Sequence, residues 1–86
     1  MIACQCRAAR AVLNWSTSEL AGRAGVSRST IADFERGARQ PISNNLGALI
    51  SAFGAAGVTM VHEGTRVGVA WAENGERRSV TLETRQ

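Results

Sequence analysis

Side chains that could form a covalent intermediate or bind a metal ion are few in this 86-residue chain. Cys4 and Cys6 form a CxC pair, and the single histidine, His62, lies far along the sequence. The pair supplies at most two of the four ligands that zinc prefers. On a helix the two cysteines would project about 200° apart, which disfavours a disulfide. We therefore expect Cys6 to be a small buried apolar residue and Cys4 to be partly exposed, with no metal bound.

Motifs of known enzyme classes are missing as well. The sequence contains neither GxSxG nor a glycine-rich phosphate loop. His62 falls in a segment whose alternating pattern is that of a strand. The sequence therefore predicts a protein that is not an enzyme and uses no cofactor.

Arginine is the residue type whose chemistry most clearly indicates a binding partner. All ten basic residues are arginine, and the formal net charge is +3. Residues 1–57 contain six arginines and three acidic residues, whereas residues 58–86 contain four arginines and four glutamates. The positive excess is therefore confined to the first two thirds of the chain, where it would attract phosphate groups.

The stretch 16–37, STSELAGRAGVSRSTIADFERG, predicts two short helices joined by a tight turn. Ser16 and Glu19 form a capping box that starts the first helix, and Gly25 stops it, because glycine accepts the left-handed conformation of helix ends. Ser27 caps the next helix, which ends at the glycine of FERG. Helices joined by so short a turn cross steeply and leave the second helix exposed. This pattern is typical of a helix-turn-helix, whose second helix fits the major groove of DNA.

Two further helices flank this stretch. Apolar residues recur at helical spacing over residues 3–14 and again over residues 44–56. Pro41 cannot lie inside a helix, so the second of these segments follows a loop, with Ser43 as its predicted cap. Four short helices with a shared core are expected.

The pattern changes after Gly57. Residues 58–62, residues 67–71 and the SVTLET segment alternate apolar with small or polar side chains, as strands do. The Asn74-Gly75 dipeptide favours a two-residue hairpin turn, because both of its central positions need positive φ. We expect a mainly α fold, with a helical domain over residues 1–57 and a short antiparallel β meander over residues 58–86. The apolar face of the meander must pack on the helices or on another chain; it comprises Val58, Met60, Val67, Val69, Trp71, Val80 and Leu82.

Residues 5–58 resemble the phage repressor and Cro-like (XRE) family of helix-turn-helix proteins. The tryptophan-serine entry, the LAxRAGVS turn, the STI core, the FERG end and the proline loop occur in the family's order and spacing. The resemblance implies a bundle of four or five helices that binds an operator as a two-fold dimer. The chain departs from the family after Gly57, where many members have a fifth helix for dimerisation.

The resemblance also implies which residues contact DNA. Base contacts would come from Arg28, Ser29 and Asp33, and Arg28 could form a forked contact with guanine. The Asp33 carboxylate could accept from cytosine or hold Arg28 or Arg36 by a charge pair, and we favour the second role. Members of the family also pair the positions of Arg10 and Glu35 beneath the DNA backbone, which implies a structural ion pair here. Contacts to the DNA backbone would come from Thr17, Ser27, Thr30, Arg36, Arg39, Gln40, Ser43, Asn44 and Arg10.

These features predict a sequence-specific, double-stranded DNA-binding transcriptional regulator. We expect an autoregulatory homodimer on a palindromic or pseudo-palindromic operator. We expect the strands to build the dimer interface through Val67, Val69 and Trp71, although Trp71 could equally be core beneath the sheet. The alternative is an antitoxin or protein-interaction module whose C-terminal strands bind a partner such as a toxin or an anti-regulator.

The sequence gives no sign of membrane association or export. No run of about 18 apolar residues occurs, and the first ten residues lack the apolar centre of a signal peptide. We therefore expect a cytoplasmic protein.

Overall fold

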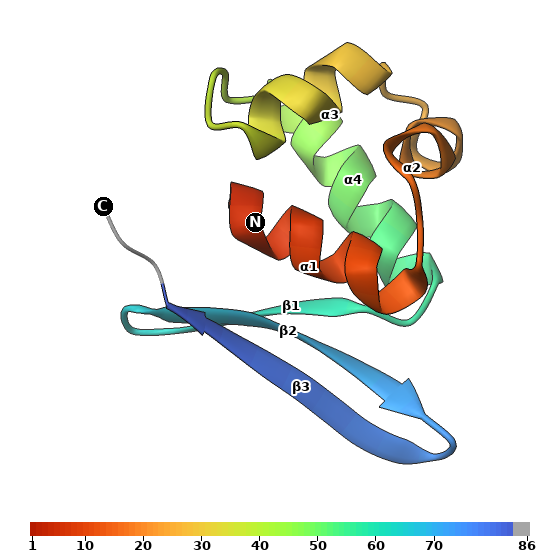
Figure 1. Ribbon diagram of the computed structural model, residues 1–86, viewed down its shortest axis with the longest axis vertical. Helices are drawn as coiled ribbons and strands as arrows, with labels where there is room; N and C mark the ends of the chain where they lie inside the picture. Colours follow the sequence, from red (N-terminus) through yellow and green to blue (C-terminus); the bar gives the residue numbers. More distant parts are fainter. Residues whose placement is uncertain (84–86) are drawn as a thin grey trace.

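The computed structural model describes residues 1–83, which form four α-helices followed by a three-stranded antiparallel sheet (Figure 1). The predicted fold class, a mainly helical bundle with a short C-terminal β meander, is therefore confirmed. The elements in chain order are α1 Ala3–Leu13, α2 Thr17–Ala24, α3 Arg28–Glu35, α4 Ser43–Ala55, β1 Thr59–Glu63, β2 Arg66–Glu73 and β3 Glu76–Glu83.

The boundaries of α2 are set by local hydrogen bonds. Ser16 Oγ accepts from the backbone N–H of Glu19 at 3.0 Å, and Gly25 ends the helix with a φ of 68°. Only this half of the predicted capping box forms, because the Glu19 carboxylate accepts instead from Arg23 Nε at 2.9 Å. The serine caps and the terminal glycine are therefore the sequence signals that fix this helix.

The start of α4 differs from the prediction. Ser43 is the first helical residue, and the cap position belongs to Ile42, whose side chain makes no capping hydrogen bond. The Ile42 carbonyl accepts from the Leu46 N–H at 3.0 Å and so begins the helical ladder. The predicted capping role of Ser43 is therefore wrong, because the helix begins one residue earlier than its serine cap would require.

The sheet has the order β1-β2-β3, with both neighbouring pairs antiparallel. The predicted Asn74-Gly75 turn is present, with φ values of 52° and 81°. Because both residues adopt positive φ, the strands pair up to the turn, where Glu73 faces Glu76. As a result, β2 and β3 extend further toward this turn than the alternating pattern predicts.

One core serves both the helices and the sheet. Its buried apolar side chains are Cys6, Ala9, Leu20, Val26, Ile31, Phe34, Leu49, Phe53, Val58 and Val69. The helices cover one face of β1 and β2, and α3 lies on the side of the helical layer away from the sheet (Figure 1). Contacts between layers are made mainly by α1 with β2 and by α4 with β1.

A single buried polar side chain fastens α1 to the sheet. The Gln5 side chain, in a residue only 3% exposed, donates from Nε2 to the carbonyl oxygens of Val61 at 3.0 Å and Gly68 at 2.9 Å. Its Oε1 accepts from the N–H of Ile2 at 2.9 Å. Gln5 therefore links the first helix to both strands of the β1-β2 hairpin, and each of its polar atoms has a partner.

The third strand lies away from the helices (Figure 1). Gly68 is buried, and a Cβ at this position would lie 2.1 Å from the carbonyl oxygen of Val80. The backbone of β3 therefore comes close to β2 where only glycine fits. Two residues of the predicted apolar face lie on β3. Val80 was expected to be buried but is 40% exposed, and Leu82 is half-buried.

Candidate nucleic-acid interface

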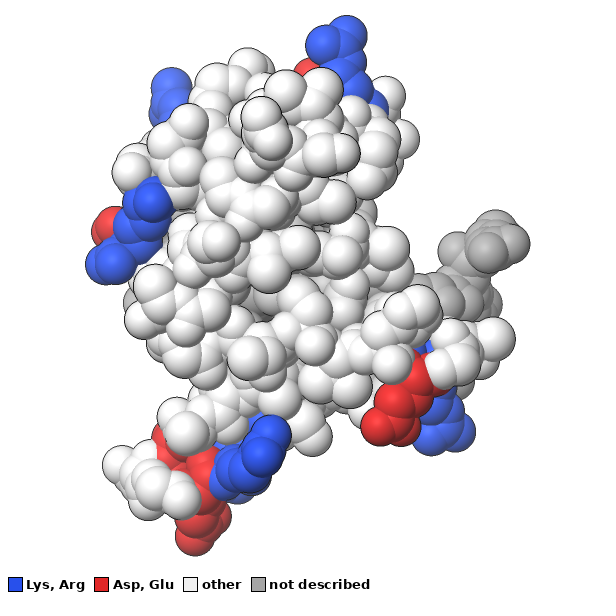
Figure 2. Space-filling model, turned by 180° about the vertical axis from the view of Figure 1, so that it is seen from behind, with Lys and Arg blue, Asp and Glu red and all other residues white. Residues whose placement is uncertain are grey.

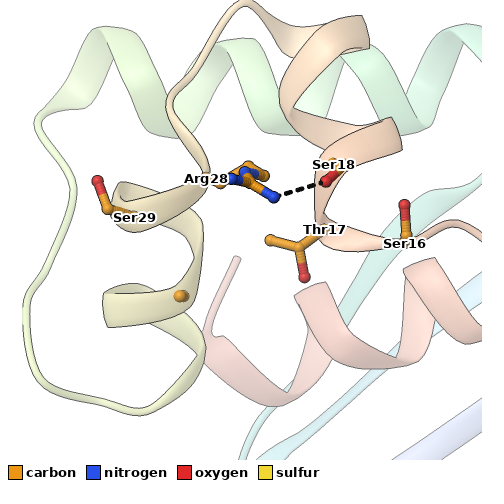
Figure 3. Close-up of a pocket in the computed structure, with 6 residues that line it drawn as sticks. Ser16, Thr17, Ser18, Arg28 and Ser29 are labelled. Carbon is orange, nitrogen blue, oxygen red and sulfur yellow. Dashed lines mark hydrogen bonds between the residues drawn. The ribbon is translucent and has the colours of Figure 1, made fainter.

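An open pocket lies between the first turns of α2 and α3 (Figure 3). Both helices present their N-terminal ends here, where unpaired backbone N–H groups and the helix dipole favour an anion. Serine caps position both ends. The lining residues are Ser16, Thr17, Ser18, Arg28, Ser29 and Ala32.

Arg28 crosses this pocket from α3 to α2. Its Nη1 donates to Ser18 Oγ at 3.2 Å, as the dashed line in Figure 3 marks. Because the partner is a neutral hydroxyl, the guanidinium keeps its charge and its remaining donors for another group. Sequence reasoning missed Ser18, since no local pattern indicates a contact between residues ten apart across a turn.

Three hydroxyl groups gather at the start of α3. Ser27 Oγ accepts from the Thr30 N–H at 3.2 Å and donates to Thr30 Oγ1 at 2.8 Å. It also lies 3.3 Å from Ser29 Oγ. The helix start is thus held by its own side chains, while Ser27 and Ser29 remain exposed.

Asp33 does not line the pocket. Its carboxylate forms an ion pair with Arg36, one turn along the helix. Of the roles considered for Asp33, the structure places the carboxylate in the charge pair with Arg36, and Arg28 has Ser18 as its partner instead.

In the helical part every acidic residue has an arginine partner, but some arginines have no acidic partner. Each of its three acidic residues is matched with one arginine, in the pairs Arg10–Glu35, Arg23–Glu19 and Arg36–Asp33. Within residues 1–57, this leaves Arg7, Arg28 and Arg39 without a carboxylate partner. The positive excess of the helical part therefore resides in these three side chains.

Arg10 and Glu35 join α1 to the end of α3. The guanidinium contacts the carboxylate twice, from Nε to Oε2 at 2.8 Å and from Nη2 to Oε1 at 2.7 Å. Arg10 Nη1 donates to the carbonyl oxygen of Trp15 at 3.0 Å, and Cys6 Sγ donates to Glu35 Oε2 at 3.1 Å. Arg7 donates to the Glu35 carbonyl. This network fixes the C-terminal end of α3 against α1.

The pKa values in this network follow from burial and hydrogen bonding. Burial acts to raise the pKa of Glu35, but the hydrogen bonds from Arg10 and Cys6 outweigh it, so the pKa is lowered. The hydrogen bond to Glu35 raises the pKa of Arg10, against the effect of burial. Burial, followed by the hydrogen bond to Glu35, raises the pKa of the Cys6 thiol. Cys6 is thus buried and Cys4 half-buried, as the sequence predicts.

The residues expected to contact the DNA backbone differ in how far their side chains are exposed. Thr17 and Thr30 are half-buried in the first turns of α2 and α3, and Ser27 is exposed beside them. The side chain of Arg10 is 21% exposed and engaged in the ion pair. The others are exposed along the α3–α4 connection and the start of α4: Arg36, Arg39, Gln40, Ser43 and Asn44.

The residues expected to form a dimer interface lie mostly inside the single chain. Val67 and Val69 are 6% and 0% exposed within one chain, so their side chains do not reach the surface. Trp71 is half-buried and packs against the same core. On the helix-facing side of the sheet, Val80 of β3 is the apolar side chain with a large exposed fraction.

A second feature of the surface is an area without charge. Seen from behind, the molecule shows a broad uncharged region with arginines and acidic residues at its margins (Figure 2). The helix α4 has no charged residue, and Ile50 on it is 39% exposed. None of the residues of α4 lines the pocket between α2 and α3.

Within residues 1–83 the structure contains no cluster of three or more His, Cys, Asp or Glu side chains that could hold a metal ion. None of the helices in this range has both the length and the apolar character needed to cross a membrane.

Comparison with family models finds a match that covers most of the chain. Residues 2–62 match a family model described as a helix-turn-helix domain. A comparison with curated proteins finds no significant match. The matched range contains α1–α4 and most of β1, and with them the pocket formed by the two helix N-termini. The chain therefore belongs to the helix-turn-helix domain family.

Proposed function

We propose that this protein is a sequence-specific DNA-binding transcriptional regulator that acts in the cytoplasm as a homodimer and controls its own gene. The observation that carries the proposal is the pocket between α2 and α3. There, two helix N-termini and the guanidinium of Arg28 converge on an open surface. An anionic backbone and the edge of a base are ligands that this combination suits.

In this proposal α3 enters the major groove, and the first turn of α2 meets a phosphate. Arg28 then exchanges its contact with Ser18 for the O6 and N7 of guanine, or keeps it while contacting the base. Arg7 and Arg39, which have no carboxylate partner within residues 1–57, add attraction to the DNA backbone without selecting a sequence. The Arg10–Glu35 pair acts indirectly, by holding α3 at a fixed angle to α1.

Fluorescence anisotropy tests this proposal with a duplex from upstream of the protein's own gene and a shuffled duplex of equal length. We expect preference for the native duplex to persist as salt is raised. Arg28→Ala should weaken specific binding by about 1–3 kcal/mol. The matched control is Arg66→Ala, an exposed arginine at the start of the central strand β2. Equal, salt-sensitive binding to both duplexes would show phosphate attraction alone and reject the proposal of autoregulation.

For the dimer we propose edge-to-edge pairing of β3 with β3 of a second copy. This strand has one neighbour, β2, and its other edge is free within residues 1–83. Two such edges pair about a two-fold axis perpendicular to the sheet. Both helical layers then lie on the same face of a continuous sheet, and both α3 helices point away from it (Figure 1). That arrangement suits two half-sites on one side of a DNA duplex.

Analytical ultracentrifugation of two matched variants tests this interface. Val80 and Ile50 are 40% and 39% exposed, so Val80→Glu and Ile50→Glu place the same charge at equally exposed sites. We expect Val80→Glu to shift the full chain toward monomer and Ile50→Glu to leave the dimer intact. The reverse result would assign the dimer to the uncharged surface of α4.

The second candidate function is a protein-interaction module. The same free edge of β3 supports it, because a partner such as a toxin or an anti-regulator can add a strand there. A wild-type chain that is monomeric and shows no sequence-specific DNA binding, yet forms a stoichiometric complex with the product of a neighbouring gene, would favour this function.

A further inference from the structure

The α3 residues that line the pocket differ from the set that the family resemblance implies for base contacts. Arg28, Ser29 and Ala32 line the pocket, whereas Asp33 is paired with Arg36 and does not. Ala32 follows Arg28 by four residues and Ser29 by three, so the three side chains lie on one face of the helix. Ala32 is exposed.

Ala32 cannot read a base by hydrogen bonding, because its side chain is a methyl group. In the major groove the apolar feature that distinguishes one base from the others is the C5-methyl group of thymine. We therefore infer that Ala32 determines specificity by packing its methyl group against a thymine C5-methyl. This inference rests on the proposed DNA-binding function and adds the identity of one base to it.

Helix geometry limits where that thymine lies. Four residues advance about 6 Å along an α-helix, and neighbouring base pairs are separated by about 3.4 Å. If Arg28 contacts guanine, the thymine contacted by Ala32 is one or two base pairs away in the same half-site. A longer side chain at position 32 would separate α3 from the floor of the groove, so a small apolar residue suits this position.

The test begins with selection of tight-binding duplexes from a random pool, using the full chain. Each thymine of the selected site is then replaced in turn by deoxyuridine, which removes only the C5-methyl group. We expect one replacement, one or two base pairs from a conserved guanine, to weaken binding by about three- to tenfold, as the loss of one buried methyl group predicts. Thymines elsewhere in the duplex should be insensitive.

Variants at position 32 connect the effect to the side chain. In Ala32→Gly the difference between thymine and uracil at that position should fall to nearly onefold. Because glycine also weakens a helix, Ala32→Ser is tested in parallel and thermal melting is recorded for both. In Ala32→Ser the polar hydroxyl should likewise reduce the preference for thymine.

The outcomes separate the inference from the proposed function. Selection that yields no preferred sequence overturns both. Specific binding that is indifferent to every uracil replacement overturns the inference alone. So does a sensitive thymine whose effect is unchanged in both variants, because another side chain then contacts the methyl group.

Discussion

Arg10 and Glu35 form a two-point ion pair with side chains that are 21% and 9% exposed. Removing one partner leaves the other charge half-buried and unmatched, which costs more than the loss of an exposed pair. We expect Arg10→Ala to lower the free energy of unfolding by about 2–4 kcal/mol and to weaken DNA binding. Urea denaturation measures the stability. Arg78→Ala, which breaks the exposed pair with Glu76, is the control and should cost at most about 0.5 kcal/mol. Equal losses in both variants would remove the special role of the Arg10–Glu35 pair.

Acid should destabilise the protein through Glu35. The pKa of Glu35 is lowered in the folded state, so its contribution to stability is complete above the usual value of 4.5. That contribution is lost as pH falls through the lower folded value. Thermal melts between pH 7 and pH 3 should show this loss in the wild type. In Glu35→Gln the decline should be shallower, and an unchanged slope would argue against the assignment.

Alkaline conditions should act through Cys6. Its pKa is raised from the usual 9.0 in the folded state, so its contribution is complete below that pH and declines as pH rises toward the folded value. We expect the melting temperature to fall above about pH 9 and the fall to be smaller in Cys6→Ala. Cys4→Ala serves as the control, since Cys4 is half-buried. A matching change in the Cys4 variant would contradict this prediction.

Gln5 should prove important for stability although it does not line the pocket between α2 and α3. Gln5→Leu removes the two hydrogen bonds to the carbonyls of Val61 and Gly68 and leaves these groups beside an apolar side chain. We expect a loss of about 2–3 kcal/mol, measured by urea denaturation. Gln40→Leu, at an exposed position, should change stability by at most about 0.5 kcal/mol. A tolerated Gln5→Leu would mean that apolar packing alone holds the sheet on α1.

Two glycine substitutions should change stability in opposite directions. In Gly68→Ala the new Cβ meets the Val80 carbonyl oxygen at 2.1 Å, so β3 must move, at a cost of about 1–3 kcal/mol or more. In Gly47→Ala nothing lies within 4 Å of the new Cβ, and the helix gains about 0.5–1 kcal/mol. Differential scanning calorimetry of both variants measures the contrast. A stabilised Gly68→Ala protein would show that β3 separates from β2 easily.

Features that depend on residues close together in the sequence could be predicted, whereas features that depend on the packing of whole elements could not. Helix ends at Ser16, Gly25 and Ser27 depend on neighbours within a few residues, and the turn at Asn74-Gly75 depends on its own two residues. These features were predictable. The cap of α4 was not, because Ser43 is acceptable as a cap or as the first helical residue, and the packing of the helix decides between the two.

Contacts between distant segments escaped the sequence analysis for the same reason. The bond from Arg28 to Ser18 and the position of β3 away from the helices depend on how whole elements pack. The alternating pattern of SVTLET indicates a strand, yet it cannot tell which apolar side chains the helices reach. Gln5 did have a detectable signal: it precedes Ala9 by four residues and therefore shares the apolar face of α1.

The hydrogen bonds of Gln5 also set an order of events during synthesis. Its partners lie 56 and 63 residues further along the chain, so a ribosome has made about four fifths of the protein before α1 can satisfy its buried amide. Until Gly68 and Val69 emerge, the Gln5 side chain is exposed to water, and the core lacks Val69. Chains that end before β2 therefore lack this link between α1 and the sheet, and proteases should remove them in preference to the full chain.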